Sequence, residues 1–183
     1  MVVVKIPDRN EVIEDPAEAR SHLSKIGIQY EEWKASKPLN KNSTAAEILS
    51  AYSSDIDKLK ISGGYTTADV IDMTPETQGI DSMLAKFNKE HWHDEDEVRF
   101  TLEGRGLFHI HPEGGDVVVV EVTKGDLLRI PRKTLHWFEL CEEKRIRAIR
   151  LFQNMSGWTP YYSRSGVDAR YQPVCMGPAY IKA

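Results

Sequence analysis

The chain lacks the features that direct proteins to nucleic acid, to membranes or to secretion. It has 24 Lys and Arg against 28 Asp and Glu, and the net charge of −4 argues against nucleic acid or an anionic membrane as partner. No apolar run approaches the ~18 residues of a membrane-spanning helix. Residues 1–5 are too short and wrongly flanked for a signal peptide. We therefore expect a soluble, cytoplasmic protein.

Cysteine is also scarce. Only Cys141 and Cys175 are present, and they form no CxxC motif. Because this usage fits a reducing compartment, we expect both thiols to be free and neither to bind metal.

The sequence contains no internal repeat, linker or low-complexity segment. A chain of 183 residues is long enough for one well-filled core. We expect one domain, 1–183, in which a mixed α/β region (1–86) packs on a barrel (87–162) and an irregular tail follows (163–183). The sequence does not fix the oligomeric state, and a monomer is the expectation.

The first 86 residues combine helical and extended patterns. Extended segments are expected at 2–6, 28–33 and 68–73. Asp15 before Pro16 predicts the start of one helix. Ser43 or Thr44 caps a second helix whose apolar residues recur on one face as far as residue 56. Helical spacing returns at 80–87.

From residue 90 the pattern changes to short strands separated by turns. The strands are expected at 98–102, 106–111, 117–122, 127–130, 135–140 and 146–152. Strands that start about 8–12 residues apart are typical of a sandwich or barrel. The sequence therefore predicts a mainly β fold with an α-containing N-terminal region.

Three histidines and one glutamate are the candidate metal ligands. His91 and His93 are two residues apart, so on a strand they point to the same face, roughly 7 Å apart. On a helix they would diverge by about 200°. Glu97 would lie about 13 Å past His93 on a straight strand, so we expect the chain to turn through 94–96 and return Glu97 on a neighbouring strand. His136 follows a second ordered segment and completes the set.

This ligand set suits a first-row transition metal but does not choose among iron, nickel, manganese, cobalt and zinc. An octahedral ion with four such ligands keeps two open positions, whereas a structural zinc site is tetrahedral and closed. Open positions suit a substrate that binds through two oxygens, such as an enediol. The ion would act as a Lewis acid and orient the substrate.

Plainer interpretations exist for several of these residues. A second pair, His109 and His111, is expected to be strand-end residues near a hairpin, with a weak adventitious metal site as the alternative. The acidic residues 94–96 fit a solvated turn. Arg99 shares parity with Glu97 and is expected in the same interior; the alternatives are an outward side chain or an ion pair with Asp94 or Asp96. Arg150 is equally compatible with the interior and with solvent.

The order of these residues resembles that of a known superfamily. HxHxxxE at 91–97, with Gly104 after six further residues, and G-x5-P-x4-H at 125–136 resemble the two cupin motifs. Lys133 stands where the second motif commonly has glycine, and Leu140 where it commonly has asparagine. More narrowly, five segments resemble the acireductone dioxygenase family, and the layout agrees from residue 1 to 162. These segments are 90–93, 96–100, 103–108, 136–138 and 149–152.

The resemblance implies a cupin barrel (a double-stranded β-helix or jelly roll) in which His91, His93, Glu97 and His136 hold one Fe(II) or Ni(II) ion. It implies acireductone, 1,2-dihydroxy-5-(methylthio)pent-1-en-3-one, and O2 as substrates in methionine salvage. With Fe(II) the products would be 4-methylthio-2-oxobutanoate and formate. With Ni(II) they would be 3-methylthiopropanoate, formate and carbon monoxide.

The resemblance also implies roles for four residues around the ion. Arg99 would promote formation of the substrate dianion, and Arg150 would face the substrate. Glu90 would assist metal loading, and Asp96 would relay local changes of shape. From the residues alone, Glu90 and Asp96 could equally be acidic surface residues.

Three aromatic residues could form an apolar wall for the thioether side chain of the substrate. They are Phe87, Phe138 and Trp158, and the alternative for each is an ordinary core aromatic. Two other functions remain open on the sequence: a different cupin dioxygenase or isomerase, and a cupin that senses a metal or ligand without catalysis. The lack of a basic patch and of a DNA-binding helical module counts against a regulator.

Overall fold

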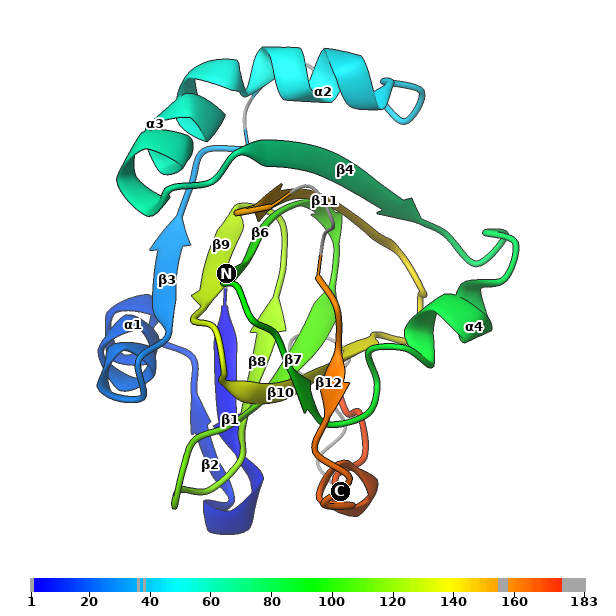
Figure 1. The fold of residues 1–183 in the computed structure, drawn as a ribbon. Coiled ribbons are helices and arrows are strands. Elements are labelled where there is room, and N and C mark those ends of the chain that lie inside the picture. Colours follow the sequence, from blue (N-terminus) through cyan, green and yellow to red (C-terminus); the bar gives the residue numbers. More distant parts are fainter. Residues whose placement is uncertain (1, 36, 38, 155–157, 176–183) are drawn as a thin grey trace.

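Two antiparallel sheets face each other in the computed structural model, which describes residues 2–35, 37, 39–154 and 158–175 (Figure 1). The seven-stranded sheet has the order β12 (Tyr161–Tyr162), β5 (His91–Trp92), β10 (Leu135–Leu140), β7 (Gly106–His111), β8 (Val118–Val122), β1 (Val3–Ile6), β2 (Glu11–Ile13). The five-stranded sheet has the order β3 (Gln29–Glu32), β9 (Asp126–Ile130), β6 (Glu97–Gly104), β11 (Ile146–Phe152), β4 (Thr67–Met73). The expected mainly β fold is confirmed.

The N-terminal region contributes strands as well as helices. Its helices are α1 (Pro16–Lys25), α2 (Ala45–Ala51), α3 (Ser53–Gly63) and α4 (Ile80–Leu84), and a 3₁₀ turn, η1 (Pro7–Arg9), joins β1 to β2. β1 and β2 extend the seven-stranded sheet, whereas β3 and β4 form the two edges of the five-stranded sheet. Residues before 87 therefore belong to both walls of the barrel and do not only pack against it.

Helix caps in this region follow local chemistry. The Asp15 side chain accepts hydrogen bonds from the amides of Ala17 and Glu18, both at 2.9 Å, at the start of α1. Thr44, the second of the two expected caps, forms a capping box with Glu47 at the start of α2. The single helix expected after it is broken at Tyr52, which is buried and packs edge-on against Phe100 with ring centroids 5.4 Å apart. The Tyr52 backbone, at φ −103° and ψ 12°, separates α2 from α3.

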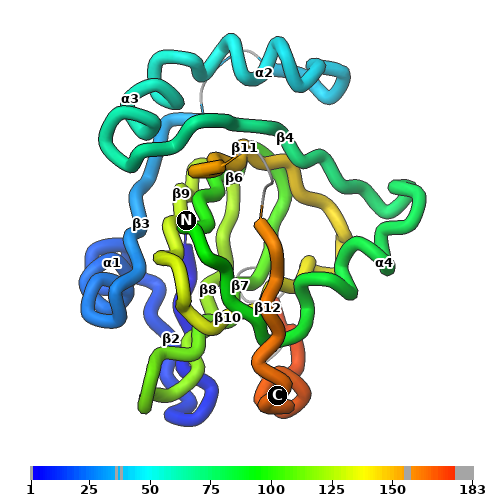
Figure 2. The backbone as a smooth tube through the Cα atoms, viewed as in Figure 1, coloured from blue at the N-terminus to red at the C-terminus, as the bar shows by residue number. Residues whose placement is uncertain are grey.

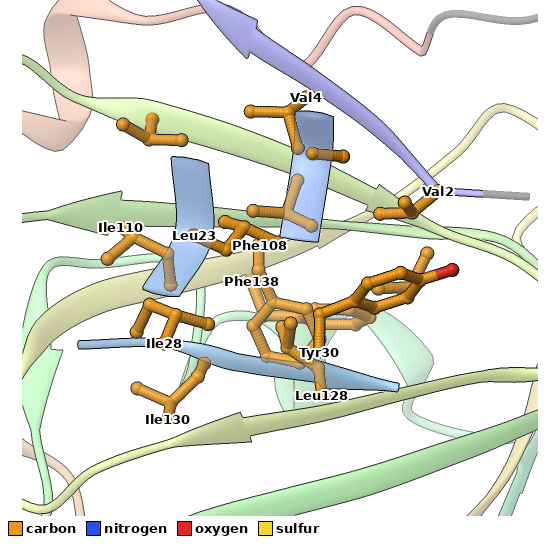
Figure 3. Packing of buried hydrophobic residues seen from close by; sticks show 14 of the residues in the cluster. Val2, Val4, Leu23, Ile28, Tyr30, Phe108, Ile110, Leu128, Ile130 and Phe138 are labelled. Atoms are coloured by element: carbon orange, nitrogen blue, oxygen red, sulfur yellow. The ribbon is translucent and has the colours of Figure 1, made fainter. Parts of the chain in front are cut away.

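The main core lies between the two sheets. Figure 3 shows Phe108 and Phe138 of the seven-stranded sheet packed among side chains of the other sheet, including Tyr30 and Leu128. The rings of Phe108 and Phe138 have centroids 4.8 Å apart. A second cluster joins the outer face of the five-stranded sheet to α2 and α3, through residues such as Ile48. The barrel interior is thus apolar around the site described below.

Two turns of the motif segments take backbone conformations that favour glycine. Gly104 joins β6 to β7 with φ 78°, and a Cβ there would lie 1.9 Å from the carbonyl oxygen of Arg145. Lys133 has φ 67°, in the left-handed region. A positive φ explains in physical terms why glycine is common at that position of the motif.

The C-terminal segment runs beside the barrel from β12 to a second 3₁₀ turn, η2 (Asp168–Arg170), as Figure 2 shows in orange to red. In this segment Cys175 forms a disulfide with Cys141, so the expectation that both thiols are free is wrong. The fold brings together two residues 34 positions apart in the sequence, with 5.8 Å between their Cα atoms. The last part of the expected tail, 176–183, lies outside the described residues. Within the described ranges, no helix has the length and apolar character needed to cross a bilayer.

Candidate metal centre

Three histidine rings converge inside the barrel. His91 on β5 lies opposite His136 on β10, and His93 follows β5 directly. One possible ligand nitrogen from each ring lies within 4.8 Å of the other two. The three side chains are at most 2% exposed. Because β5 and β10 are hydrogen-bonded neighbours, the sheet itself brings two of the rings together.

Each ring is oriented by a backbone carbonyl. The Nδ1 atoms of His91, His93 and His136 lie 2.6, 2.8 and 2.8 Å from the carbonyl oxygens of Lys89, Thr159 and Thr134. A carbonyl can only accept, so each Nδ1 carries a proton, and Nε2 is the ring atom left to face the centre. This tautomer is the one that presents Nε2 to a metal.

The ring nitrogens that face the centre fit a metal ion. The Nε2 atoms of His91 and His93 are buried and, among the described residues, have no hydrogen-bond partner. A buried polar atom without a partner costs about 1–3 kcal/mol. A divalent ion held by these imidazoles would satisfy both atoms. Burial and the nearby His136 also lower the pKa of His91 to about 3, so this ring is neutral near neutral pH and its lone pair is available.

The carboxylate of Glu97 lies beside two of the three rings. Its Oε2 lies 3.1 Å from Nε2 of His136 and 3.3 Å from Nε2 of His93. The route of the chain differs from the expected one: Glu97 begins β6, which belongs to the five-stranded sheet and is not a neighbour of β5. Residues 94–96 cross from one sheet to the other, so the carboxylate approaches the rings from the facing wall.

Arg99 points into the same interior, two residues after Glu97. It is 6% exposed, and its Nη2 lies 2.8 Å from Oε1 of Glu97, so it is neither outward-facing nor paired with an acidic residue of the 94–96 turn. Its guanidinium lies 4.4 Å from the ring centre of Phe138 and 5.8 Å from that of Trp158. Burial opposes ionisation of Glu97, but the charge of Arg99 outweighs it and holds the pKa of Glu97 well below its usual range. The carboxylate is therefore charged and ready to bind a cation.

A cavity of about 570 Å³ adjoins Arg99. Its walls contain all five residues that the sequence suggested for substrate contacts: Phe87, Arg99, Phe138, Arg150 and Trp158. The rest of the lining is mostly apolar and comes from β4 and α4, through residues such as Ile71, Met73 and Met83. The cavity therefore has a cationic end and an apolar end.

Arg150 is held at the cationic end by a partner that the sequence did not reveal. It lies opposite Arg99 in the β6–β11 register, and its Nε and Nη2 donate to the two carboxylate oxygens of Asp69 on β4 at 2.8 and 2.6 Å. Such a bidentate pair fixes the orientation of the guanidinium. Asp69 lies on a strand distant in the sequence, so no local sequence pattern indicated this ion pair.

Glu90 and Asp96 are buried, which excludes the alternative that they are surface residues. Glu90 precedes His91 but binds away from the rings, 2.5 Å from Nδ1 of His111. Asp96 precedes Glu97 and accepts hydrogen bonds from Arg129 and from the hydroxyl of Tyr65 at 3.1 Å. Each acid thus anchors the backbone beside one candidate ligand.

The acidic turn is also less solvated than expected. Only Asp94 is exposed, with 57% of its side chain accessible, whereas Glu95 is buried. Glu95 accepts from the amides of Gln153 and Asn154 at 2.6 and 3.2 Å and from the Asn154 side chain at 2.8 Å. Sequence reasoning missed this residue because its partners are 58 and 59 positions away.

The second histidine pair lies on the outer face of the seven-stranded sheet. His109 is buried and stacks on Trp137, with ring centroids 4.7 Å apart and planes 6° apart, and burial lowers its pKa to about 4. His111 pairs with Glu90. Among the described residues, the cluster of possible metal ligands contains neither of them.

Comparisons with known proteins agree with this geometry. The family model described as the ARD/ARD' family matches residues 5–160. An acireductone dioxygenase of Xylella fastidiosa (strain M12) is 39% identical over 170 residues, which cover 93% of this chain and 87% of that protein. An acireductone dioxygenase of Aquifex aeolicus is 39% identical over 159 residues, 87% of this chain and 86% of that protein.

A solved structure agrees as well. The acireductone dioxygenase from Bacillus anthracis with a cadmium ion in its active centre is 35% identical, with a TM-score of 0.84 over 88% of this chain and 98% of that chain. The expected cupin barrel is thereby confirmed. The chain belongs to the ARD/ARD' family, the acireductone dioxygenases.

Proposed function

We propose that this protein is an acireductone dioxygenase of methionine salvage, which cleaves acireductone with O2 and depends on one Fe(II) or Ni(II) ion per chain. The observation that carries the proposal is the convergence of three buried imidazoles next to the carboxylate of Glu97, beside a cavity with a cationic and an apolar end. The proposed ligands are His91, His93, Glu97 and His136. Imidazole nitrogen and carboxylate oxygen suit iron and nickel alike.

A bound ion of this kind would supply a Lewis acid that favours the doubly deprotonated enediol. The protein's own contribution to that deprotonation is Arg99. Its guanidinium stays charged at neutral pH and lies in a water-poor interior, where a positive charge favours substrate oxyanions more strongly than in water. Arg99 also lines the cavity, so it can reach a substrate there.

The cavity supports the choice of substrate. Its volume of about 570 Å³ is ample for a small enediol with a methylthioethyl arm. We place the enediol oxygens at the end with Arg99 and Arg150, and the thioether between Phe87, Phe138 and Trp158. Aromatic walls around the arm would exclude water from the reacting end.

Glu90 and Asp96 are proposed to act through the ligands that follow them in the chain. Each is buried and bonded to partners outside the centre, so each can hold the backbone of His91 or of Glu97. Roles for Glu90 in metal loading and for Asp96 in relaying changes of shape rest on the family resemblance. A cytoplasmic location and a monomeric state, expected from composition, complete the proposal.

The test is aerobic turnover of acireductone by protein reconstituted with one metal at a time. We expect oxygen uptake with both Fe(II) and Ni(II), with the keto acid and formate as products for iron, and with carbon monoxide among the products for nickel. Metal-free protein provides the baseline. A protein that binds one ion per chain but consumes no oxygen above that baseline with either metal would contradict the proposal.

A further inference from the structure

The C-terminal strap, residues 158–175, holds two of the three histidines in place. The carbonyl of Thr159 faces Nδ1 of His93 at 2.8 Å. Strand β12 pairs with β5 so that Tyr162 lies opposite His91. Because the carbonyl sets the ring orientation of His93 and β12 completes the sheet beside His91, movement of the strap would disturb both rings.

Further along, the strap binds the residue that precedes His91. The hydroxyls of Ser163 and Ser165 each lie 2.5 Å from Oε1 of Glu90, and the amide of Ser163 donates to the Glu90 carbonyl at 3.1 Å. A buried carboxylate is costly without such partners. The two serines therefore tie the strap to the start of β5.

The far end of the strap is fastened by the disulfide. Cys175 is bonded to Cys141, which directly follows β10, the strand that carries His136. Val167 and Tyr171 of the strap pack beside this disulfide against the outer face of the seven-stranded sheet. The disulfide thus connects the strand of His136 to the segment that orients the His93 ring and pairs with the strand of His91.

The other contacts of the strap lie near the surface, such as the hydrogen bonds from the hydroxyls of Tyr162 and Tyr171 to the Lys86 carbonyl at 2.9 Å and to Asp8 at 2.6 Å. None of the described residues from 158 to 175 is fully buried, so the strap contributes little to the apolar core. Segments of this kind open locally at low free-energy cost unless they are tethered. A covalent link at the far end limits such opening because it removes conformational freedom from the open state.

The disulfide is also accessible to a small thiol. Both cysteines line a cavity of about 460 Å³, which is separate from the cavity beside Arg99. Cys141 is 3% exposed, whereas Cys175 is partly exposed. Cys175 Sγ is therefore the sulfur that an incoming thiolate would reach.

We propose that Cys141–Cys175 is a thiol–disulfide exchange site at which low-molecular-weight thiols open and close the strap and thereby set how tightly the metal centre holds its ion. A thiolate of the reductant attacks Cys175 Sγ, the bond between the two protein sulfurs breaks, and Cys141 leaves as a thiolate that takes up a proton. A second reductant thiol then releases Cys175 as a thiol. In total, two reductant thiols become one disulfide and the protein gains two thiols.

The test measures metal release from the full-length protein without substrate. Protein loaded with Co(II) is mixed with excess chelator, once in the oxidised form and once after reduction by a phosphine that is then removed. We expect the reduced form to release Co(II) about 10-fold faster, the scale on which loss of a ligand's orienting partner weakens metal binding. Titration of thiols confirms the two forms as none and two per chain.

Two variants control the experiment. Cys175→Ser should release Co(II) at the rate of the reduced protein under both conditions, because it has no disulfide to open. Ser43→Ala, a substitution outside the strap, should keep the difference between the oxidised and reduced forms. Equal release rates for oxidised and reduced wild-type protein would overturn the proposal, as would two free thiols after incubation with oxidised glutathione. Because no turnover is measured, this result is independent of the proposed dioxygenase activity.

Discussion

His91 and His136 lie directly opposite each other on β5 and β10, with ring centroids 4.6 Å apart. The register of two hydrogen-bonded strands therefore positions both rings before any ion binds. His93 differs, because it lies beyond β5 and its ring is oriented by the carbonyl of Thr159. A preorganised site of this kind avoids most of the cost of ordering its ligands.

Replacement of His91, His93 or His136 by alanine should abolish tight metal binding and turnover. Removal of a ligand costs more than removal of its orienting partner, so the metal dissociation constant should rise by more than about 100-fold. Metal content after gel filtration and titration with Co(II) measure this. His22→Ala, a substitution in α1, is the matched control. Full metal content in all three single variants would refute the site.

Arg99→Met should leave the metal bound but slow the reaction. The side chain keeps its bulk beside Phe138 and loses the charge that favours the substrate dianion. Loss of one electrostatic stabiliser of this kind lowers turnover by about 10²–10³-fold. Anaerobic formation of the dianion spectrum measures the step directly, and Arg9→Met, a surface arginine, is the control. An unchanged spectrum and rate would remove Arg99 from its role.

Glu95→Gln should weaken substrate binding without loss of metal. Glu95 accepts from Gln153 and Asn154, which begin the segment leading to Trp158 in the cavity wall. Hydrogen bonds to a charged group contribute about 1.5–3 kcal/mol, so we expect KM to rise by about 10-fold while kcat changes little.

The neighbouring acid provides the control for that variant. Asp94 is exposed and pairs with Lys133 on the surface at 2.5 Å. Because surface pairs contribute about 0–1 kcal/mol, Asp94→Asn should leave KM within about twofold of wild type. Loss of metal from Glu95→Gln, or equal KM changes in both variants, would show that Glu95 does not act through the Trp158 segment.

The free energy of unfolding should depend on pH through His109. Burial lowers its folded-state pKa from 6.5 to about 4. Between these values the unfolded chain binds the proton and the folded chain does not, so stability falls as the pH is lowered through this range and is fully present above it. The contribution is about 3 kcal/mol. Urea unfolding of wild type and His109→Phe from pH 7 to 4 should give a flatter dependence for the variant; identical slopes would exclude His109 as the cause.

Local patterns predicted most of the barrel. β7, β10 and β11 have the bounds expected from alternation of apolar residues between turns, and Asp15 caps α1 as expected. These features depend on residues close together in the chain, because the alternation of apolar side chains and the choice of turn residues determine local structure directly. Tyr52 shows the limit, because the helix breaks there although the local pattern continues, while its ring packs against Phe100 of a distant strand.

The order of residues alone determined which groups could bind a metal and that most of them would lie on strands. Only the tertiary structure decided that Glu97 approaches from the facing sheet, that Asp69 pairs with Arg150, and that Cys141 meets Cys175. The reason is physical. The period of a strand is a local property, whereas the partner of a buried charge or thiol depends on which distant segments the packing of the core brings together.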